Sequence, residues 1–218
     1  MATQSLEKSA AVAVSGDGGK RRQIIDGARR LFLAQGFDAA SMNAIAQEAG
    51  VSKGTLYVYF KSKEELFEAI VEEQCGKQAE QIFTFDSDGD VAAVLTRLGG
   101  EFVRFLCRPG GVPPLRAVIA IADRMPELGA KFYLAGPARG IASLQVYLEA
   151  QVAAGVLRPH DCEVAAAQFI DSCLSLTFKP MMFNFAGPPM EEQITRVVRA
   201  AVHTFMAAYG RAGEGACG

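Results

Sequence analysis

One short predicted helix carries side chains suited to binding a nucleic acid. Its outward side presents a cation, hydroxyl groups and flat rings, from Lys53, Thr55, Tyr57 and Tyr59. Leu56 and Phe60 can hold its other side on a core, whereas an ordinary surface helix more often carries Glu and Lys pairs. Because ammonium and hydroxyl groups bond to DNA phosphates and base edges, residues 53–59 predict a helix that enters a major groove.

Two capping serines and a glycine position this helix. Ser41 can cap a preceding helix from Met42 to Ala49, and Ser52 can cap the helix that starts at Lys53. Gly50 stands between them, where the chain can turn through positive φ without a Cβ penalty. Two helices joined by so tight a turn must cross steeply, which predicts a helix-turn-helix.

Two further helices are expected around this motif. Ser62 and Glu65 form a capping box, so a third helix starts at Lys63, and its apolar spacing continues to about Phe85 as a rigid link. A first helix ending at Gly36 has one apolar face that must cover the motif. The residues of that face are Ile24, Ile25, Ala28, Leu31 and Phe32, with Phe37 and Met42 completing the small core.

The run GFDAASMNAIAQEAGVSKGTLYVYFKSKEELFEAIV, residues 36–71, resembles the DNA-binding domain of TetR-family transcriptional regulators. Ala40 departs from the family pattern, which often has a threonine there. The resemblance implies a repressor that binds a duplex, and the alternative is a helical hairpin that only shares the turn chemistry. The expected DNA-binding residues are Ser41, Ser52, Lys53, Gly54, Thr55, Tyr57, Tyr59 and Lys63. Among them Lys53, Thr55 and Tyr57 are expected in the groove, and Ser41, Tyr59 and Lys63 on phosphates.

Charge is distributed unevenly along the chain. Residues 20–63 contain eight Lys or Arg against three acids, a net charge of +5, whereas the whole chain carries -2. A basic end can sit on phosphates while the rest stays off the duplex. Lys20, Arg21 and Arg22 either touch DNA or are a solvated start of the first helix.

Composition argues against several other classes of protein. No apolar run is long enough for a membrane span or a signal peptide, so we expect a cytoplasmic protein. Five cysteines without a CxxC spacing and two histidines predict reduced thiols, no metal and no cofactor. The acidic run FDSDGD has Leu95 where a calcium loop needs glutamate. No Ser/His/Asp or Cys/His arrangement is visible, so no catalytic residue is assigned and an enzyme is not expected.

The remaining chain predicts an all-α protein of about nine helices. The later helices are expected at Val91 to Cys107, Leu115 to Ala122 (buried), Met125 to Val156 with a break at Gly136 and Pro137, Cys162 to Phe183, and Met190 to Tyr209. The expected domains are a disordered tail (1–19), a helix-turn-helix domain (20–66), a larger ligand-binding and dimerisation domain (67–210) and a flexible tail (211–218).

Dimerisation is expected through the last two helices, as the TetR resemblance implies. The final helix has an apolar stripe too wide for one neighbour, so part of it is expected to face a second copy: Ile194, Val197, Val198, Ala201, Val202, Phe205 and Met206. Small residues on the preceding helix would allow close approach: Ala165, Ala166, Ala167, Ser172 and Ser175. A homodimer with two-fold symmetry should bind a roughly palindromic operator on double-stranded DNA.

A small hydrophobic or aromatic effector is expected in the second domain. Its candidate contacts are Phe102, Phe105, Met125, Phe132, Tyr133, Tyr147, Phe169, Cys173, Phe178 and Met182, for each of which plain core packing is the alternative. Residues 116–140 also resemble the effector domain of TetR-family members that control efflux and stress genes, but Ile121 and Met125 replace their usual glutamate and phenylalanine. An adaptor that kept the fold but lost DNA binding stays open as a third possibility.

Overall fold

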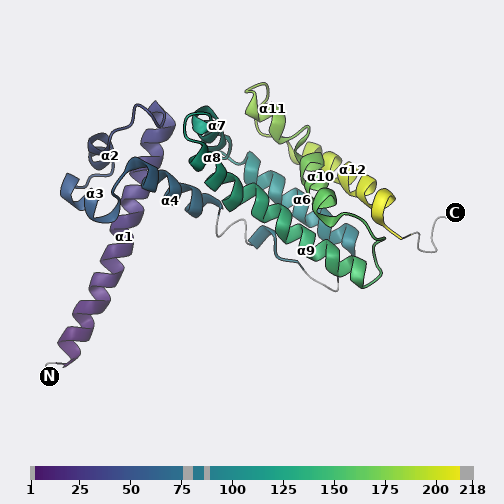
Figure 1. Ribbon diagram of the computed structural model, residues 1–218, viewed down its shortest axis with the longest axis horizontal. Coiled ribbons are helices and arrows are strands. Elements are labelled where there is room, and N and C mark those ends of the chain that lie inside the picture. The colour runs from purple at the N-terminus through teal and green to yellow at the C-terminus, as the bar shows by residue number, and fades with distance from the viewer. Residues whose placement is uncertain (1–2, 76–80, 86–88, 212–218) are drawn as a thin grey trace. The chain divides into compact units, whose positions relative to one another are not determined.

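The computed structural model describes residues 3–75, 81–85 and 89–211, and in these ranges all regular structure is helical apart from one isolated bridge between Leu157 and Gly210. The all-α prediction is therefore confirmed (Figure 1). The chain divides into two compact units. The first contains residues up to Gln74 together with Ala117–Lys131, and the second contains Cys75–Arg116 and Phe132 onward. No helix in the described part of the chain has the length and apolar character needed to cross a membrane.

The first unit is built on four helices. These are α1 (Thr3–Gln35), α2 (Met42–Glu48), α3 (Lys53–Tyr59) and α4 (Lys63–Cys75). Gly36 ends α1 with a φ of 82°, a left-handed conformation that glycine adopts without strain. The predicted face of α1 is buried, and Phe32, Phe37 and Phe67 form a cluster of rings with centroids 5.2 to 6.1 Å apart. Two short helices thus gain a core that they could not form alone.

Helix α1 begins earlier than expected. Residues 3–19 belong to its continuous helix, whereas the sequence predicted an unstructured tail over residues 1–19. The segment 6–14 contains Leu, Glu, Lys and three alanines, which all have high helix propensity, and no proline interrupts it. Its small and polar composition was therefore a poor guide to its conformation.

A second segment of the chain completes the first unit. It contains the last part of α7 (Val112–Ala122) and most of α8 (Pro126–Tyr133). Arg124 forms an ion pair with Asp38 in the α1–α2 loop, and Lys131 forms one with Glu68 on α4. The predicted boundary between residues 66 and 67 therefore differs from the observed division, in which α4 up to Gln74 and residues 117–131 belong with the helix-turn-helix.

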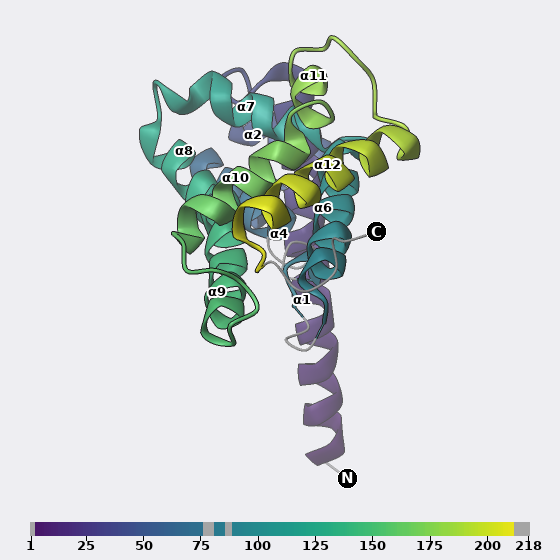
Figure 2. The ribbon, with the colours of Figure 1, turned by 90° about the vertical axis from the view of Figure 1, so that its right-hand side faces the viewer.

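The second unit packs four long helices around one core. They are α6 (Val91–Cys107), α9 (Arg139–Ala153), α10 (Cys162–Leu174) and α12 (Glu191–Tyr209), and the short α11 (Phe178–Met182) lies between the last two in sequence. Helix α12 packs on α6 and α10, and α10 packs on α9 (Figures 1 and 2). Arg104 on α6 donates two hydrogen bonds, of 2.8 and 2.7 Å, to Glu191 at the start of α12. These bonds raise the pKa of Arg104 and lower the pKa of Glu191.

Several predicted helices are divided differently, so the described ranges contain more helices than the nine expected. The predicted helix from Cys162 to Phe183 is divided into α10 and α11, and residues 175–177 form a turn between them. Helix α4 ends at Cys75, and residues 76–80 of its predicted continuation lie outside the described residues. The break predicted at Pro137 is instead a π-helical turn over Leu134–Ala138, which joins α8 to α9. A π-helical turn is a common way to accommodate a proline, which has no backbone N–H to donate.

Two expectations about burial are wrong. Helix α7 was expected to be buried, yet Ile119 is 56% exposed, and only Val112, Val118 and Ile121 of this helix are buried. The apolar stripe of α12 was expected to lie partly on a second copy. Its members from Ile194 to Phe205 are all buried within the chain, since α6 and α10 both cover them. Ala165 and Ala166 are likewise fully buried, so neither can lie on an outer face of α10.

Candidate nucleic-acid interface

The predicted helix-turn-helix forms with the expected caps. The Ser41 Oγ accepts a hydrogen bond from the Ala44 N–H at 3.2 Å, and the Ser52 Oγ accepts one from the Thr55 N–H at 3.0 Å. Gly50 has a φ of 64° and supplies the turn between α2 and α3. In the third helix the Ser62 Oγ caps as expected, but the Glu65 carboxylate accepts from the Lys61 N–H instead of from Ser62. The motif therefore follows from local hydrogen bonding that can be read in the sequence.

Helix α3 buries one side and exposes the other. Leu56 is fully buried, which fixes the rotation of the helix, whereas Lys53 and Gly54 are exposed and Tyr57 is 45% exposed. The Lys53 Nζ lies 5.9 Å from the centre of the Tyr57 ring, so these two side chains are neighbours one turn apart. The Thr55 hydroxyl is 2.8 Å from the Ser52 hydroxyl. Lys53 and Tyr57 therefore share one exposed side of α3, and the partly exposed Thr55 lies next to Ser52.

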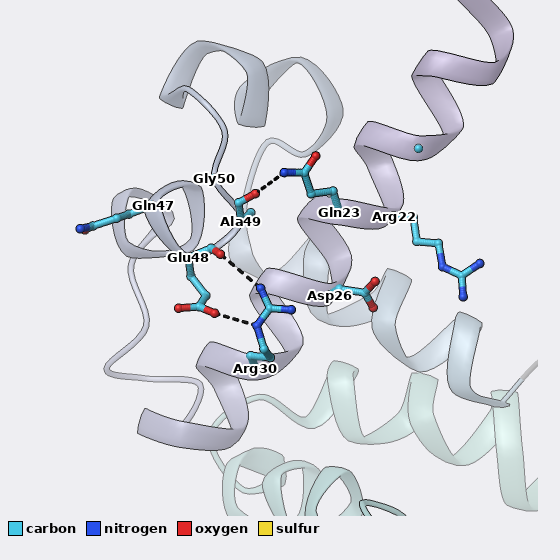
Figure 3. A pocket seen from close by; sticks show the side chains of 9 residues that line it. Arg22, Gln23, Asp26, Arg30, Gln47, Glu48, Ala49 and Gly50 are labelled. Atoms are coloured by element: carbon cyan, nitrogen blue, oxygen red, sulfur yellow. Dashed lines mark hydrogen bonds and ion pairs between the residues drawn. The ribbon is translucent and has the colours of Figure 1, made fainter.

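Helix α1 holds the end of α2 through three residues on one face. Gln23 donates to the Ala49 carbonyl at 2.7 Å, and Arg30 donates to the Glu48 carboxylate at 2.7 Å and to its carbonyl at 3.2 Å (Figure 3). Between them Gly27 lies against Ala49, and a Cβ at position 27 would stand 2.7 Å from the Ala49 Cα. This close crossing sets the position of α2 and therefore of the α3 that follows it.

A shallow groove of about 590 Å³ runs along this crossing. Arg22 and Arg30 line it together with Asp26 and Glu48, so its charges balance. Figure 3 shows Arg30 turned toward Glu48 across the groove. None of its lining residues is an expected effector contact. We interpret the groove as the outer edge of the α1–α2 packing.

Lys63 has a structural role in addition to any contact with DNA. Its Nζ donates to the carbonyls of Phe37, Asp38 and Ala40 at 3.0, 3.2 and 3.4 Å, and it stands 4.6 Å from the centre of the Phe37 ring. The α1–α2 loop is therefore tied to the first residue of α4. The predicted phosphate contact of Lys63 would have to share this ammonium group.

We predict that Lys63→Met destabilises the protein by about 2 kcal/mol, because three carbonyls lose a charged donor. Lys61→Met is the matched control, since the Lys61 side chain is exposed, and it should change the stability by less than about 0.5 kcal/mol. Urea unfolding followed by circular dichroism measures both variants. Equal urea midpoints for the two variants would show that Lys63 has no structural role.

Val58 is an exposed residue of α3 that is absent from the predicted DNA contacts. It lies on α3 between two predicted contacts and is 81% exposed. The signal that could have found it is its spacing, two residues from Leu56 and two from Phe60, which places it opposite the buried side of the helix.

The expected effector residues fall into three groups. Tyr147, Phe169, Cys173 and Phe178 are buried in the second unit, Phe102, Phe105, Phe132 and Met182 are partly buried there, and Tyr133 is 54% exposed. Met125 is the exception, since it belongs to the first unit. Residues 117–131 therefore belong to the first unit and not to the region that holds the other candidates.

An aromatic cluster brings two of these residues together with two that were not expected. Phe85 stacks on Tyr147 with ring centres 4.8 Å apart, and Phe83 meets Phe102 edge-on at 5.6 Å. Phe83 and Phe85 are themselves 6.4 Å apart. Four rings from α6, α9 and the segment before α6 thus meet at one place in the second unit.

The buried cysteines are not poised for chemistry. Burial raises the pKa of the Cys107 thiol to about 11 and the pKa of the Cys173 thiol to about 12. Both thiols are therefore protonated at neutral pH, which keeps them poor nucleophiles and poor metal ligands. In the part of the chain that the structure describes, no three His, Cys, Asp or Glu side chains gather in a metal-binding arrangement.

Two protein-family models match separate parts of the chain. A model described as "Bacterial regulatory proteins, tetR family" matches residues 24–70. A second, described as "AefR-like transcriptional repressor, C-terminal domain", matches residues 93–211. The curated HTH-type transcriptional repressor Rv1474c of Mycobacterium tuberculosis is 40% identical over 60 residues, which are 28% of this chain and 32% of that protein. The chain thus matches about a third of the length of this relative.

Solved structures extend the similarity beyond the helix-turn-helix. The Flavonoid-responsive Regulator FrrA has a TM-score of 0.80 and 31% identity, over 90% of this chain and 100% of that chain. A TetR-family transcriptional regulator from Mesorhizobium loti has a TM-score of 0.80 and 29% identity, over 89% of this chain and 98% of that chain. Since the C-terminal model alone covers more than half of the residues and the N-terminal model covers the helix-turn-helix, the chain belongs to the TetR family of transcriptional regulators.

Proposed function

We propose that the protein is a ligand-responsive repressor that binds a roughly palindromic operator as a homodimer. The observation that carries this proposal is the outward surface of α3, where Lys53, Gly54 and Tyr57 are exposed opposite the buried Leu56. Lys53, Thr55 and Tyr57 are proposed for base edges, and Ser41, Ser52, Tyr59 and Lys63 for the phosphate backbone. An exposed Gly54 leaves room for the duplex to approach closely.

An electrophoretic shift on the promoter next to its own gene tests this function. A repressor should bind that promoter with an affinity that falls steeply as salt rises, because phosphate contacts release counterions. A scrambled duplex of the same length and base composition controls for nonspecific binding. An adaptor that kept the fold but lost DNA binding would show no shift at any salt concentration.

We infer that dimerisation uses the outer faces of α10 and α12, since the apolar stripe of α12 is already covered within the chain. The outer face of α10 carries Glu163 and Asp171, and the outer face of α12 carries Arg196 and Arg199. A two-fold axis that lays α10 on the partner's α12 would bring opposite charges together. Ala200 lies on the same outer face of α12, where a small side chain permits close approach.

We predict that Ala200→Arg weakens the dimer at least about a hundredfold, because a long charged side chain would separate the helices. Ala120→Arg is the control, since Ala120 is exposed on α7 in the first unit. Sedimentation velocity over a range of concentrations measures the dissociation constants. A dimer of unchanged affinity in Ala200→Arg would place the interface elsewhere.

We infer an effector of aromatic character that binds in the second unit. The ring cluster of Phe83, Phe85, Phe102 and Tyr147 supports this inference, because stacked and edge-on rings favour a flat apolar molecule. The similarity to a regulator named as flavonoid-responsive points to the same class of compound. A flavone added to the protein should raise its melting temperature and weaken operator binding, since a ligand shifts an equilibrium only when it binds two states unequally. A panel of flat aromatic compounds that stabilises nothing and releases no DNA would contradict the inference.

A further inference from the structure

The recognition surface has an apolar residue at its centre. Val58 is 81% exposed, compared with 43% for Leu33, 45% for Tyr57 and 56% for Ile119, the other large apolar side chains that the described part of the first unit exposes. Val58 follows Leu56 by two residues, which is about 160° around the helix from the fully buried side. It therefore points directly away from the core.

Neither packing nor helix propensity explains this valine. A β-branched residue is less favourable in a helix than alanine, and its exposed methyl groups gain nothing from the rest of the chain. Gly54, one turn earlier, is also unfavourable in a helix, yet a Cβ there would meet only the Ser52 Oγ, at 3.8 Å. The fold therefore has room for a larger side chain at position 54, and a polar side chain at position 58 would be solvated. An open, apolar row at positions 54 and 58 thus suits a partner that approaches closely.

Polar groups flank this row on both sides. Lys53 and Tyr57 lie along one side, where the ammonium group is 5.9 Å from the centre of the ring. Thr55 and Tyr59 lie along the other side, where the Thr55 hydroxyl is 2.8 Å from that of Ser52. A basic segment around the motif favours DNA over an apolar protein as the occupant. In a major groove the apolar group that such a side chain can contact favourably is the 5-methyl group of thymine.

Resting on the proposed DNA-binding function, we propose that Val58 is a specificity-determining residue that packs on the 5-methyl group of one thymine in each half-site. Gly54 leaves the space that lets this side of α3 approach the bases. Lys53 and Tyr57 then supply affinity and polar readout beside it. The contact is apolar, so it selects thymine over cytosine at one position without adding to the salt dependence.

Replacing thymine by deoxyuridine tests the proposal, because the exchange removes only the methyl group. The probe is a palindromic duplex that wild-type protein has selected from a randomised library. Each thymine of both half-sites is exchanged in turn, and affinity is measured by fluorescence anisotropy. Wild type should lose roughly fourfold per half-site at one position, and about fifteenfold when both half-sites are changed there. Val58→Ala should bind the natural duplex more weakly and lose less than about twofold on the same exchange.

Lys53→Ala is the matched variant beside the apolar row. It should bind every duplex more weakly but keep the full loss on the deoxyuridine exchange. The exposure of Val58 means that Val58→Ala should keep the melting temperature of the parent.

The outcomes separate this proposal from the function on which it rests. If wild type selects no duplex from the library, the DNA-binding function itself is wrong. If wild type selects a duplex but no thymine methyl matters, or if Val58→Ala loses as much as wild type on the exchange, the assignment of Val58 is overturned while the regulator stands. Weakening of all duplexes alike by Val58→Ala, with no effect of deoxyuridine, would assign Val58 to the sugar-phosphate backbone and also overturn it.

Discussion

Replacing Lys53, Thr55 and Tyr57 together by alanine should lower operator affinity about a hundredfold or more, in a protein that stays folded. Each side chain that contacts a base is worth roughly 1–3 kcal/mol, and a homodimer presents two copies of the surface. Lys53 and Tyr57 are exposed on α3 and Thr55 is partly exposed, whereas the fold depends on the buried Leu56. Fluorescence anisotropy with a duplex from the protein's own promoter measures the affinity.

A control variant with the same three residue types replaced elsewhere shows whether the change in charge and composition alone alters DNA affinity. Lys179, Thr96 and Tyr133 are exposed in the second unit, so their triple alanine variant should bind DNA as tightly as the parent. Thermal melting shows whether each variant is folded. Parent-like affinity of the α3 variant would mean that α3 is not the DNA-reading element, and the proposed function would fail with it.

Gly27→Ala and Gly19→Ala should change stability in opposite directions, although both add one methyl group to α1. At position 27 the new Cβ would stand 2.7 Å from the Cα of Ala49, and backbone cannot move aside as a flexible side chain can. We expect a loss of about 2–3 kcal/mol together with weaker operator binding, because the crossing that positions α2 opens. At position 19 nothing lies within 4 Å, so alanine should gain up to about 1 kcal/mol through its helix propensity.

Urea unfolding measures this pair, and DNA binding measured well below the unfolding midpoint separates lost stability from lost geometry. A Gly27→Ala variant as stable as Gly19→Ala would show that α1 and α2 do not approach as closely as the structure has them. Gln23→Ala offers a milder version of the same test, since it removes only the 2.7 Å bond to the Ala49 carbonyl.

The helix-turn-helix could be predicted because its signals are local. Ser41, Gly50 and Ser52 each act within a few residues of their own position, through a cap or a positive φ, and the structure shows these interactions as expected. Such signals need no knowledge of the rest of the fold. The same holds for α6, whose bounds agree with the prediction from Val91 to Cys107.

The errors arose where the outcome depends on neighbours. The period of apolar residues in α12 shows which side of the helix is apolar, but only the fold shows that its members from Ile194 to Phe205 are buried where α12 packs on α6 and α10. In α7 an equally apolar composition left Ile119 56% exposed, although Val118 and Ile121 in the same helix are buried. Val58 is the opposite case, an apolar residue that the fold leaves 81% exposed.

The effector contacts stay a prediction for a related physical reason. Phe169 and Cys173 are buried, and Phe169 also packs edge-on against Phe205 at 5.9 Å, as a core residue would. Whether an aromatic residue fills a core or lines a binding site is decided by the space beside it, which sequence does not encode locally. Phe83 and Phe85 could not be assigned from sequence, since their partners Phe102 and Tyr147 come from two later helices.

The DNA-binding unit is discontinuous in sequence, and this has a consequence for protein engineering. A gene fragment cut after residue 74 would omit residues 117–131 and with them the ion pairs that Arg124 and Lys131 make with Asp38 and Glu68. Chimaeric regulators that join residues up to 74 to the ligand-binding domain of another protein would therefore lack part of the first unit. A chimaera that also contains residues 117–131 is a better starting point, and so is one in which Asp38 and Glu68, which would lose their partners, are replaced by neutral residues.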